Sequence, residues 1–267
     1  MLYINKNNLT KLNLDKMYVM ADFNKTFTKG NSKTTWSIFA SSNLFDDNYT
    51  KERNELFEIY KPFEDDETLD EEIKKKKLSE WWKKHIDLFP KYKLKEELIK
   101  KALEEDNIME LRDGVKEFLT FLSNNNIPLI IVSQGLGNFA KVFLEMNECY
   151  FDNIYISSNM IKFENGIAIN NEGNITHNFN KSEIKVPNSI LNKLQDKNQV
   201  LLLGDEISDL KILEFTKGTE NLTVGFLTKK HEHELDRYNK YFDIVCSDNT
   251  SYNEIGKLLF DNYIKAE

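Results

Sequence analysis

Short apolar runs alternate with helical patterns along most of the chain. Continuous apolar runs of four to six residues are typical of strands buried on both faces of a parallel sheet. They lie at residues 17–21, 127–132 and 200–203, and later strands are predicted at 222–227 and 242–246. Apolar residues spaced three and four apart predict helices at 114–122, 138–146, 207–215 and 251–264. This alternation predicts an α/β fold with a doubly wound parallel sheet.

Residues 31–106 interrupt the alternation. This stretch has no strong strand pattern, is rich in Lys and Glu, and shows helical patterns at 51–60 and 71–85. We therefore expect a small helical cap domain at 31–106, inserted in a core domain formed by residues 1–30 and 107–267. Within the cap, Lys74 to Lys77 lie among glutamates and are expected on a solvated helix face. Later, turn signals between 154 and 179 predict a hairpin.

Composition limits the classes of partner and the cellular location that are expected. The 267 residues are 40% hydrophobic and 30% charged, as in folded globular proteins, and the net charge of -8 argues against nucleic acid as a partner. Cys149 and Cys246 are too few for a disulfide framework and lack zinc-site spacing, so both are expected to be buried apolar residues. With neither a leader pattern nor a run of about 20 apolar residues, we expect a cytoplasmic protein without membrane contact. The oligomeric state is not readable from the sequence.

Polar residues at the strand ends carry the candidate chemistry. Asp22 follows the first buried run, Ser133 follows the second, and Asp205 and Asp209 follow the third, while Lys181 comes after the predicted hairpin. Ligands of open α/β sheets bind beyond the carboxyl ends of the strands. A hydroxyl, an ammonium group and several carboxylates are therefore expected to meet at one edge of the sheet.

These groups are the ones that transfer of a phosphoryl group needs. A carboxylate nucleophile must approach a negatively charged phosphate, so a divalent cation and positive donors have to offset the repulsion. Mg²⁺ prefers carboxylates, carbonyls and water. Asp22, Asp205 and the backbone carbonyl of Asn24 are the candidate ligands, with Asp209 bound directly or through water, and Lys181 and Ser133 would hold the phosphate.

Four motifs resemble those of the haloacid dehalogenase superfamily, in the same chain order: DFNKT, IIVSQG, the single Lys181 and GDEISD. A cap between the first and second motif also follows that pattern. The stretches SEWWKKH, SQGLGN, ISSNMIKF, HNFNKSE and LLLGDEISDL are similar to those of cytosolic pyrimidine 5′-nucleotidases. The resemblance covers nearly the whole chain. It implies a Rossmann-like core and hydrolysis of a nucleoside monophosphate through an aspartyl-phosphate.

The resemblance also implies roles for individual residues. Asp22 would be the nucleophile and the first Mg²⁺ ligand, with Asp205 and Asp209 completing the metal site. The phosphate-binding positions would be Thr26, Ser133, Gln134 and Lys181. Glu64 falls where the family has an acid that recognises the base, although a plain surface glutamate is an equal alternative.

Asn24 departs from the family pattern. Family phosphatases have an Asp at this position, which protonates the leaving oxygen and later activates water. An amide cannot exchange a proton at neutral pH, so the chain would lose roughly 10² to 10⁴-fold in rate. Three explanations stay open: an engineered trap, a naturally weak or binding-only homologue, or another group that serves as the acid.

Two other functions compete with a phosphatase. Residues 135–140 match the G-x-G-x-x-A form of a dinucleotide fingerprint, which would indicate an oxidoreductase, but the next predicted strand does not end in the acid that would hold a ribose. The second alternative is a non-catalytic protein that binds a phosphate ester. Binding of ligand without release of product would favour it.

Overall fold

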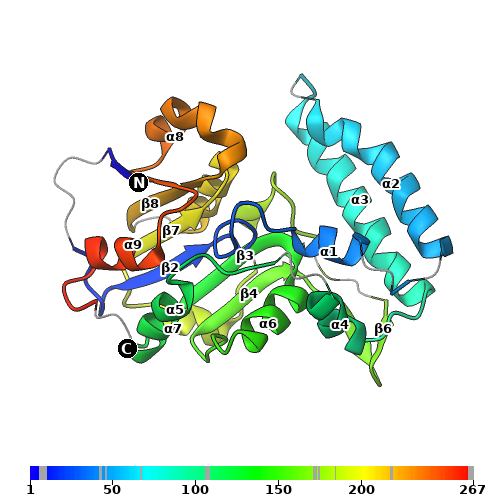
Figure 1. The fold of residues 1–267 in the computed structure, drawn as a ribbon, viewed down its shortest axis with the longest axis horizontal. Coiled ribbons are helices and arrows are strands. Elements are labelled where there is room, and N and C mark those ends of the chain that lie inside the picture. Colours follow the sequence, from blue (N-terminus) through cyan, green and yellow to red (C-terminus); the bar gives the residue numbers. More distant parts are fainter. Residues whose placement is uncertain are drawn as a thin grey trace.

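A seven-stranded sheet forms the centre of the molecule (Figure 1). The structure is a computed structural model that describes residues 1–5, 11–41, 44–45, 47–66, 68–105, 109–170, 173, 175–183, 185–216 and 219–263. Its strands are β1 (Leu2–Ile4), β2 (Met17–Ala21), β3 (Leu129–Leu136), β4 (Ile154–Asn159), β7 (Gln199–Gly204), β8 (Glu220–Leu227) and β9 (Ile244–Ser247). They are arranged in the order β1-β9-β8-β7-β2-β3-β4.

The described helices follow the alternation expected of a doubly wound sheet. They are α1 (Thr35–Ser41), α2 (Asp47–Asp65), α3 (Glu71–Lys91), α4 (Glu97–Glu105), α5 (Val115–Asn124), α6 (Gly137–Met146), α7 (Asn188–Leu194), α8 (Leu235–Tyr241) and α9 (Tyr252–Leu259). Short 3₁₀ helices are η1 (Lys181–Glu183), η2 (Ile207–Thr216) and η3 (Lys229–Glu234). The predicted α/β fold is confirmed. Two predicted helices differ in detail. Residues 207–215 form a 3₁₀ helix and not an α-helix, and the helix predicted at 251–264 is shorter, since α9 ends at Leu259.

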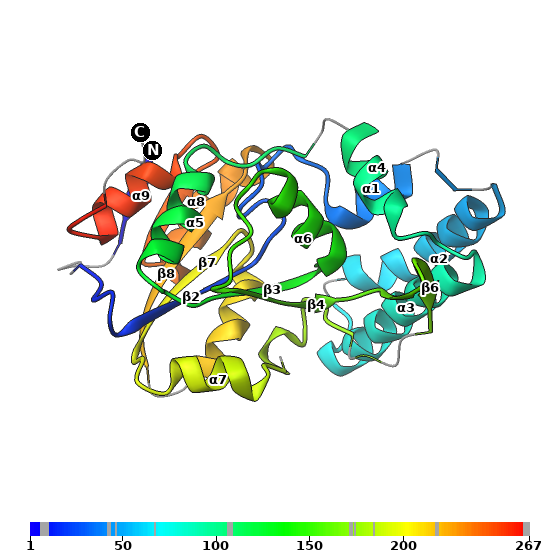
Figure 2. The same ribbon diagram turned by 90° about the horizontal axis from the view of Figure 1, so that it is seen from below.

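All six strands from β2 to β9 in the large sheet pair in parallel, whereas β1 pairs antiparallel with β9 at one edge. The sequence did not predict β1, because a three-residue edge strand leaves almost no hydrophobic pattern. The apolar runs of the central strands are continuous because both faces of the sheet are covered. Helices α5, α6 and α9 lie on one face, and α7 lies on the other (Figure 2).

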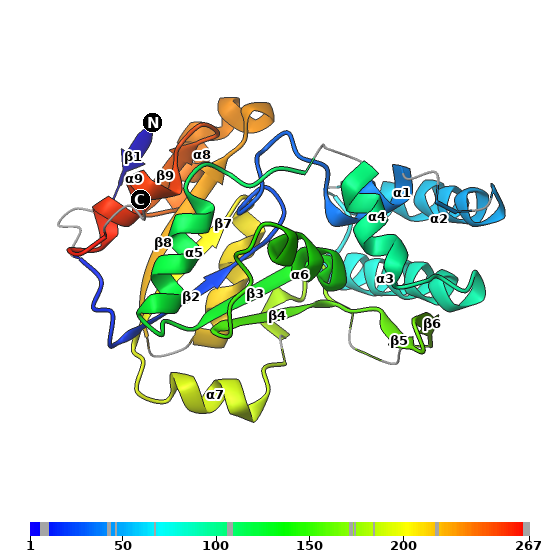
Figure 3. The ribbon, with the colours of Figure 1, turned by 60° about the horizontal axis from the view of Figure 1, so that its bottom comes forward.

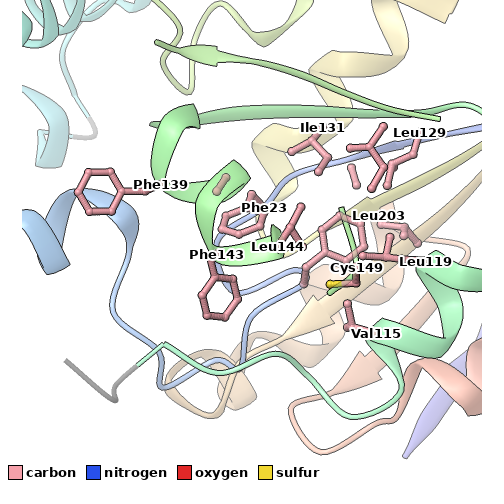
Figure 4. Packing of buried hydrophobic residues seen from close by; sticks show 14 of the residues in the cluster. Phe23, Val115, Leu119, Leu129, Ile131, Phe139, Phe143, Leu144, Cys149 and Leu203 are labelled. Carbon is pink, nitrogen blue, oxygen red and sulfur yellow. The ribbon is translucent and has the colours of Figure 1, made fainter. Parts of the chain in front are cut away.

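Strand β2 shows how alternate residues serve the two faces. Met17, Val19 and Ala21 belong to the larger core, whereas Tyr18 and Met20 belong to a second cluster that includes partly buried residues of α7 and η2. The larger core fills the space between the sheet and α5 and α6 (Figure 4). There Phe23 meets the ring of Phe143 edge to face, with the ring centroids 6.2 Å apart. Both cysteines are buried and free, as expected.

Helices α1 to α4, here called the helical insert, lie beyond the carboxyl ends of β3 and β4 (Figures 1 and 3). The predicted hairpin is present as β5 (Lys162–Glu164) and β6 (Ile167–Ile169). It joins the helical insert: the amide of Ala168 donates to the carbonyl of Leu94 over 2.8 Å, and the amide of Glu96 donates to the carbonyl of Gly166 over 2.9 Å.

One lysine of the run on α3 departs from the expected solvated face, whereas Lys76 is exposed and Lys75 and Lys77 are partly exposed. Lys74 is buried, and its ammonium group lies over the ring of Phe179, 5.6 Å from the centroid, and donates to the carbonyl of Glu64 over 3.4 Å. The aromatic ring and this carbonyl stabilise the buried lysine. Among the helices of the described residues, none has the length and apolar character needed to cross a membrane.

Candidate active site

Strand register brings the predicted residues to one edge of the sheet. Ala21 of β2 pairs with Ile131 of β3 on one side and with Leu203 of β7 on the other. Asp22 and Asp205 therefore leave adjacent parallel strands at nearly the same height. β2 is also the strand from which the chain order runs outward in both directions, the position at which doubly wound sheets bind ligands.

Lys181 is the centre of the polar cluster. Its Nζ donates to Oδ1 of Asp22 over 2.8 Å and to Oδ1 of Asp209 over 2.6 Å. The three residues are buried, with Lys181 only 2% exposed and Asp209 fully covered. Lys181 opens η1, 159 positions after Asp22, so only the tertiary fold brings the two together. Such a buried network is stable when all its members are partnered.

The electrostatics of the cluster are strongly perturbed. Burial raises the pKa of Asp22 to about 6, and the Lys181 ammonium offsets part of that rise. Burial, followed by the nearby charges of Glu206, Asp209 and Asp22, raises the pKa of Asp205 well above its usual range. Burial lowers the pKa of Lys181, but the two carboxylates outweigh it and leave that pKa raised. The cluster is therefore short of positive charge around Asp205.

Gly204 and Asp209 fix the turn after β7. Oδ2 of Asp209 accepts a hydrogen bond from the amide of Glu206 over 3.0 Å and so anchors the start of η2. A Cβ atom on Gly204 would come within 2.5 Å of the same Oδ2, so only glycine fits there. This close approach explains the glycine and the second aspartate of the GDEISD motif in structural terms.

Asn24 lies at the wall between the sheet and the helical insert. Its Oδ1 accepts a hydrogen bond from the amide of Thr35 over 3.0 Å at the beginning of α1. The Thr35 hydroxyl in turn accepts from the amide of Leu136 over 2.9 Å. A Cβ atom on Gly135 would lie 2.5 Å from Oγ1 of Thr35 and 2.8 Å from Nδ2 of Asn24. Close packing thus accounts for this glycine without a dinucleotide.

The loop after β2 is held by Arg112, which the sequence did not single out. Lys25 adopts a left-handed conformation with φ of 58°. Its carbonyl accepts from Nε and Nη2 of Arg112 over 3.0 and 2.6 Å. Nη1 of Arg112 donates to the carbonyl of Asp248 over 2.6 Å and to its Oδ1 over 3.1 Å. Arg112 is thus a positioning residue for the loop that carries Asn24.

The remaining predicted residues lie around this centre. β3 has a register irregularity between Ser133 and Leu136, and the Gln134 carbonyl within it accepts from Nε1 of Trp36 over 3.0 Å. The buried Ser133 hydroxyl accepts from the amide of Gly135 over 3.2 Å. The Thr26 hydroxyl donates to Oδ1 of Asp205 over 3.4 Å. Gln134 lines the cavity described below, whereas Thr26 faces Asp205.

The donor set fits Mg²⁺. Among the described residues, no group of three or more His, Cys, Asp or Glu side chains is arranged to hold a metal ion by itself. Mg²⁺ does not require one, because it is usually bound by one or two carboxylates together with water and substrate phosphate. Asp22 and Asp205 line the same cavity and supply two carboxylates, and a divalent cation beside them would offset the negative charge that raises the pKa of Asp205.

A cavity of about 550 Å³ joins the polar cluster to the helical insert. Asp22, Asn24, Lys181 and Asp205 lie at its sheet end. The opposite end is lined by residues of α1, α2 and α3, among them Trp36, Tyr49, Arg53, Phe57, Glu64, Trp82 and His85. One cavity therefore has a polar end at the sheet and an aromatic end at the helical insert.

Glu64 is part of this wall, but it is already paired. Lys61 donates to Oε2 of Glu64 over 2.8 Å and to Oδ1 of Asp65 over 2.5 Å. Trp82 is buried and also lines the cavity. Its ring stacks on Trp36, with the centroids 4.6 Å apart. Trp36 and Arg53 carried no motif, so the sequence did not identify them.

The sheet order, the polar cluster at the strand ends and the helical insert together define an α/β protein of the haloacid dehalogenase-like class. A solved structure of cytosolic 5′-nucleotidase IIIB bound to cytidine superposes with a TM-score of 0.82 at 24% identity, over 92% of this chain and 85% of that one. A phosphoserine phosphatase described as a phospho-aspartyl intermediate analogue gives a TM-score of 0.53 at 17% identity, over 91% and 98% of the two chains. Both show the fold.

Sequence comparison then gives the family. The profile of the pyrimidine 5′-nucleotidase (UMPH-1) family matches residues 21–261, so the chain belongs to that family. A human 7-methylguanosine phosphate-specific 5′-nucleotidase is 32% identical over 253 residues, which cover 92% of this chain and 84% of that protein. The protein of the same description from Drosophila melanogaster is 25% identical, over 88% and 76% of the two chains.

Proposed function

We propose that this protein hydrolyses nucleoside 5′-monophosphates with Mg²⁺, and that Asn24 makes it slow. One observation carries the proposal: the buried cluster of Asp22, Lys181 and Asp209 opens into a cavity whose other end is aromatic. The cavity matches the two halves of a nucleotide, a charged phosphate and a flat base. Family membership supports the same activity.

In the proposed reaction, Asp22 attacks the phosphorus atom and the bond to the ribose 5′ oxygen breaks, which leaves an aspartyl-phosphate and a nucleoside. The leaving 5′ oxygen takes its proton from water, because Asn24 cannot donate one. Water then hydrolyses this intermediate and frees phosphate and Asp22. Lys181 offsets charge on the phosphate oxygens, and Ser133, Gln134 and Thr26 belong to the same site. Mg²⁺, held by Asp22, Asp205 and the Asn24 carbonyl with Asp209 behind them, would supply further charge stabilisation.

Residues 31–106 would act as a cap that encloses the base, with Glu64 among its contacts. The Lys61–Glu64 pair supports a structural role for this acid as much as a contact to the base. The solved relative is a cytosolic nucleotidase, which supports a cytoplasmic location. No nucleic acid or membrane partner is proposed.

Asn24 decides how fast the reaction runs. Its Oδ1 is engaged by the Thr35 amide, an arrangement that a carboxylate oxygen could also adopt. Asn24→Asp should therefore fold normally and restore a proton donor for the leaving oxygen. We expect phosphate release from nucleoside 5′-monophosphates to rise at least tenfold, within the roughly 10² to 10⁴-fold range of acid/base catalysis.

The test measures phosphate release from CMP, UMP, GMP and AMP with Mg²⁺ for the protein as it stands and for Asn24→Asp. Asn192→Asp, on the exposed side of α7, makes the same chemical change away from the site and should have no effect. Equal rates for the protein and Asn24→Asp would contradict the role given to position 24. A Glu206→Gln variant asks whether the glutamate that lines the cavity acts as the acid instead.

A second function is favoured by Asn24 itself. A chain that keeps the phosphate site without the acid could bind a phosphate ester and not turn it over. A nucleotide that raises the melting temperature with no phosphate release, both before and after Asn24→Asp, would select this function.

A further inference from the structure

Arg53 lies in the wall of the cavity and has no acid partner among the residues that the structure describes. It lies on α2, and its Nε is buried with no hydrogen-bond partner among the described residues. Nη2 donates to Oδ1 of Asn54 over 2.7 Å. Because a guanidinium group stays charged in proteins, Arg53 brings a fixed positive charge and unused donors to the aromatic end of the cavity.

The acids of this wall are engaged elsewhere. Glu64 and Asp65 both accept from Lys61, and no carboxylate of the described residues pairs with Arg53. Nη2 of Arg53 is bonded only to a neutral amide among the described residues, and the guanidinium group keeps further donors on its terminal nitrogens. A ligand in the cavity that supplies acceptors to these nitrogens gains affinity.

The aromatic rings that line the cavity favour a flat ligand but do not distinguish one base from another. Trp36 stacks on Trp82 and also on His85, with the latter centroids 5.5 Å apart. Burial lowers the pKa of His85 to about 4, so its ring is neutral at physiological pH. Every base has a face that stacks on aromatic rings. The attraction of a cationic base to an aromatic ring is weaker than its repulsion by a nearby positive charge. The charge of Arg53 is therefore the element that discriminates.

We propose that Arg53 is a specificity-determining residue that selects a neutral base with adjacent acceptor atoms and rejects 7-methylguanine. This inference rests on the proposed function and names its substrate class. An arginine fork can bond O6 and N7 of guanine together, and cytosine offers O2 and N3 in the same way. Methylation of N7 removes one acceptor and gives the ring a positive charge that Arg53 repels.

The proposal sets this chain apart from its relatives. Several relatives, including the human one at 32% identity, are described as specific for 7-methylguanosine phosphate. We expect kcat/KM for GMP and for CMP to exceed that for 7-methyl-GMP at least tenfold in this protein. GMP and 7-methyl-GMP differ by one methyl group and its charge, so their ratio isolates the effect.

Two substitutions separate charge from hydrogen bonding. Arg53→Met removes both, and should bring the ratio of GMP to 7-methyl-GMP below threefold. Arg53→Lys keeps the charge but loses the fork, so it should bind GMP more weakly and still reject 7-methyl-GMP. Lys51→Met, an exposed position two residues earlier on the same helix, is the matched control and should keep the original ratio.

Titration calorimetry with guanosine and 7-methylguanosine repeats the comparison without any chemical step. If no nucleotide is hydrolysed, even by Asn24→Asp, the proposed function fails while the calorimetric ratio still decides the role of Arg53. Tighter or equal binding of 7-methylguanosine by the unchanged protein would overturn the inference. So would an Arg53→Met protein that keeps the original ratio in both assays.

Discussion

Lys181 and Arg53, two of the cations that line the cavity, are in opposite states. Lys181, at the edge of the sheet, is 2% exposed and bonded to two carboxylates, whereas Arg53, in the helical insert, is half-buried and has no acid partner among the described residues. At the sheet end, the bonds of Lys181 to Asp22 and Asp209 hold these three charges in place before any ligand arrives. The insert end leaves donors unused. Preorganised charge suits the reacting group, and unfilled capacity suits recognition.

The largest effect is expected from removal of Lys181, the centre of the polar cluster at the sheet end. Lys181→Met leaves Asp22 and Asp209 buried without their cation, so the free energy of unfolding should fall by about 3 to 5 kcal/mol. Phosphate release should fall roughly 10²-fold or more, since a preorganised donor is lost. Urea denaturation measures the first quantity, with Lys193→Met on exposed α7 as the control. A loss below about 1 kcal/mol would show that the cluster is not stabilised by its charges.

The sequence could predict the sheet end because its geometry follows from a rule. Buried parallel strands end at one edge, so Asp22, Ser133 and Asp205 had to lie near one another once the strands were recognised. Lys181 was less certain from spacing alone, because a loop of irregular structure carries it, and the family resemblance identified it. The catalytic roles of these residues stay predictions, although their positions agree with them.

The insert end could not be predicted in the same way. A helical pattern shows which residues face the core, but Arg53 and His85 face a cavity that exists only after α2, α3 and α1 have packed. Lys74 was expected in solvent for the same reason: the ring of Phe179, which covers it, comes from a segment about 100 residues later. Arg112, likewise, has meaning only through its bonds to the carbonyls of Lys25 and Asp248.

The buried histidines and Asp22 should change the stability in opposite directions when the pH falls. Burial lowers the pKa of His85 and of His177 from 6.5 to about 4. Between about pH 6.5 and pH 4 these histidines are protonated in the unfolded chain but neutral in the folded protein. The free energy of unfolding therefore falls as the pH falls through that range. At about 1.4 kcal/mol per pKa unit, each histidine contributes a loss of about 3 kcal/mol. Asp22 acts in the opposite direction, because its folded pKa of about 6 exceeds the usual 3.8.

Denaturation curves between pH 7 and pH 4 test this balance. His85→Phe should flatten the acid loss, because a ring of similar size that cannot be protonated replaces the histidine. Asp22→Asn should steepen it. His233→Phe, at an exposed position, is the control. Identical pH slopes for the protein and His85→Phe would mean that folding does not shift the pKa of His85.

The smallest expected effect concerns the contact that ties the two ends together. Lys75 of α3 pairs with Glu183 of η1, two residues after Lys181, and the side chains are 31% and 55% exposed. Exposed pairs gain little Coulomb energy and are screened by salt. A double-mutant cycle with Lys75→Met and Glu183→Gln should give a coupling energy of about 0.2 to 1 kcal/mol that disappears in concentrated salt. The Lys83–Asp87 pair within α3 provides a reference of the same kind inside one helix. Two further contacts join the insert to this segment: Lys74 with Phe179, and Ser79 with His177 over 2.9 Å. A coupling energy above about 2 kcal/mol would mean that the surface ion pair contributes more to holding the insert than expected of an exposed pair.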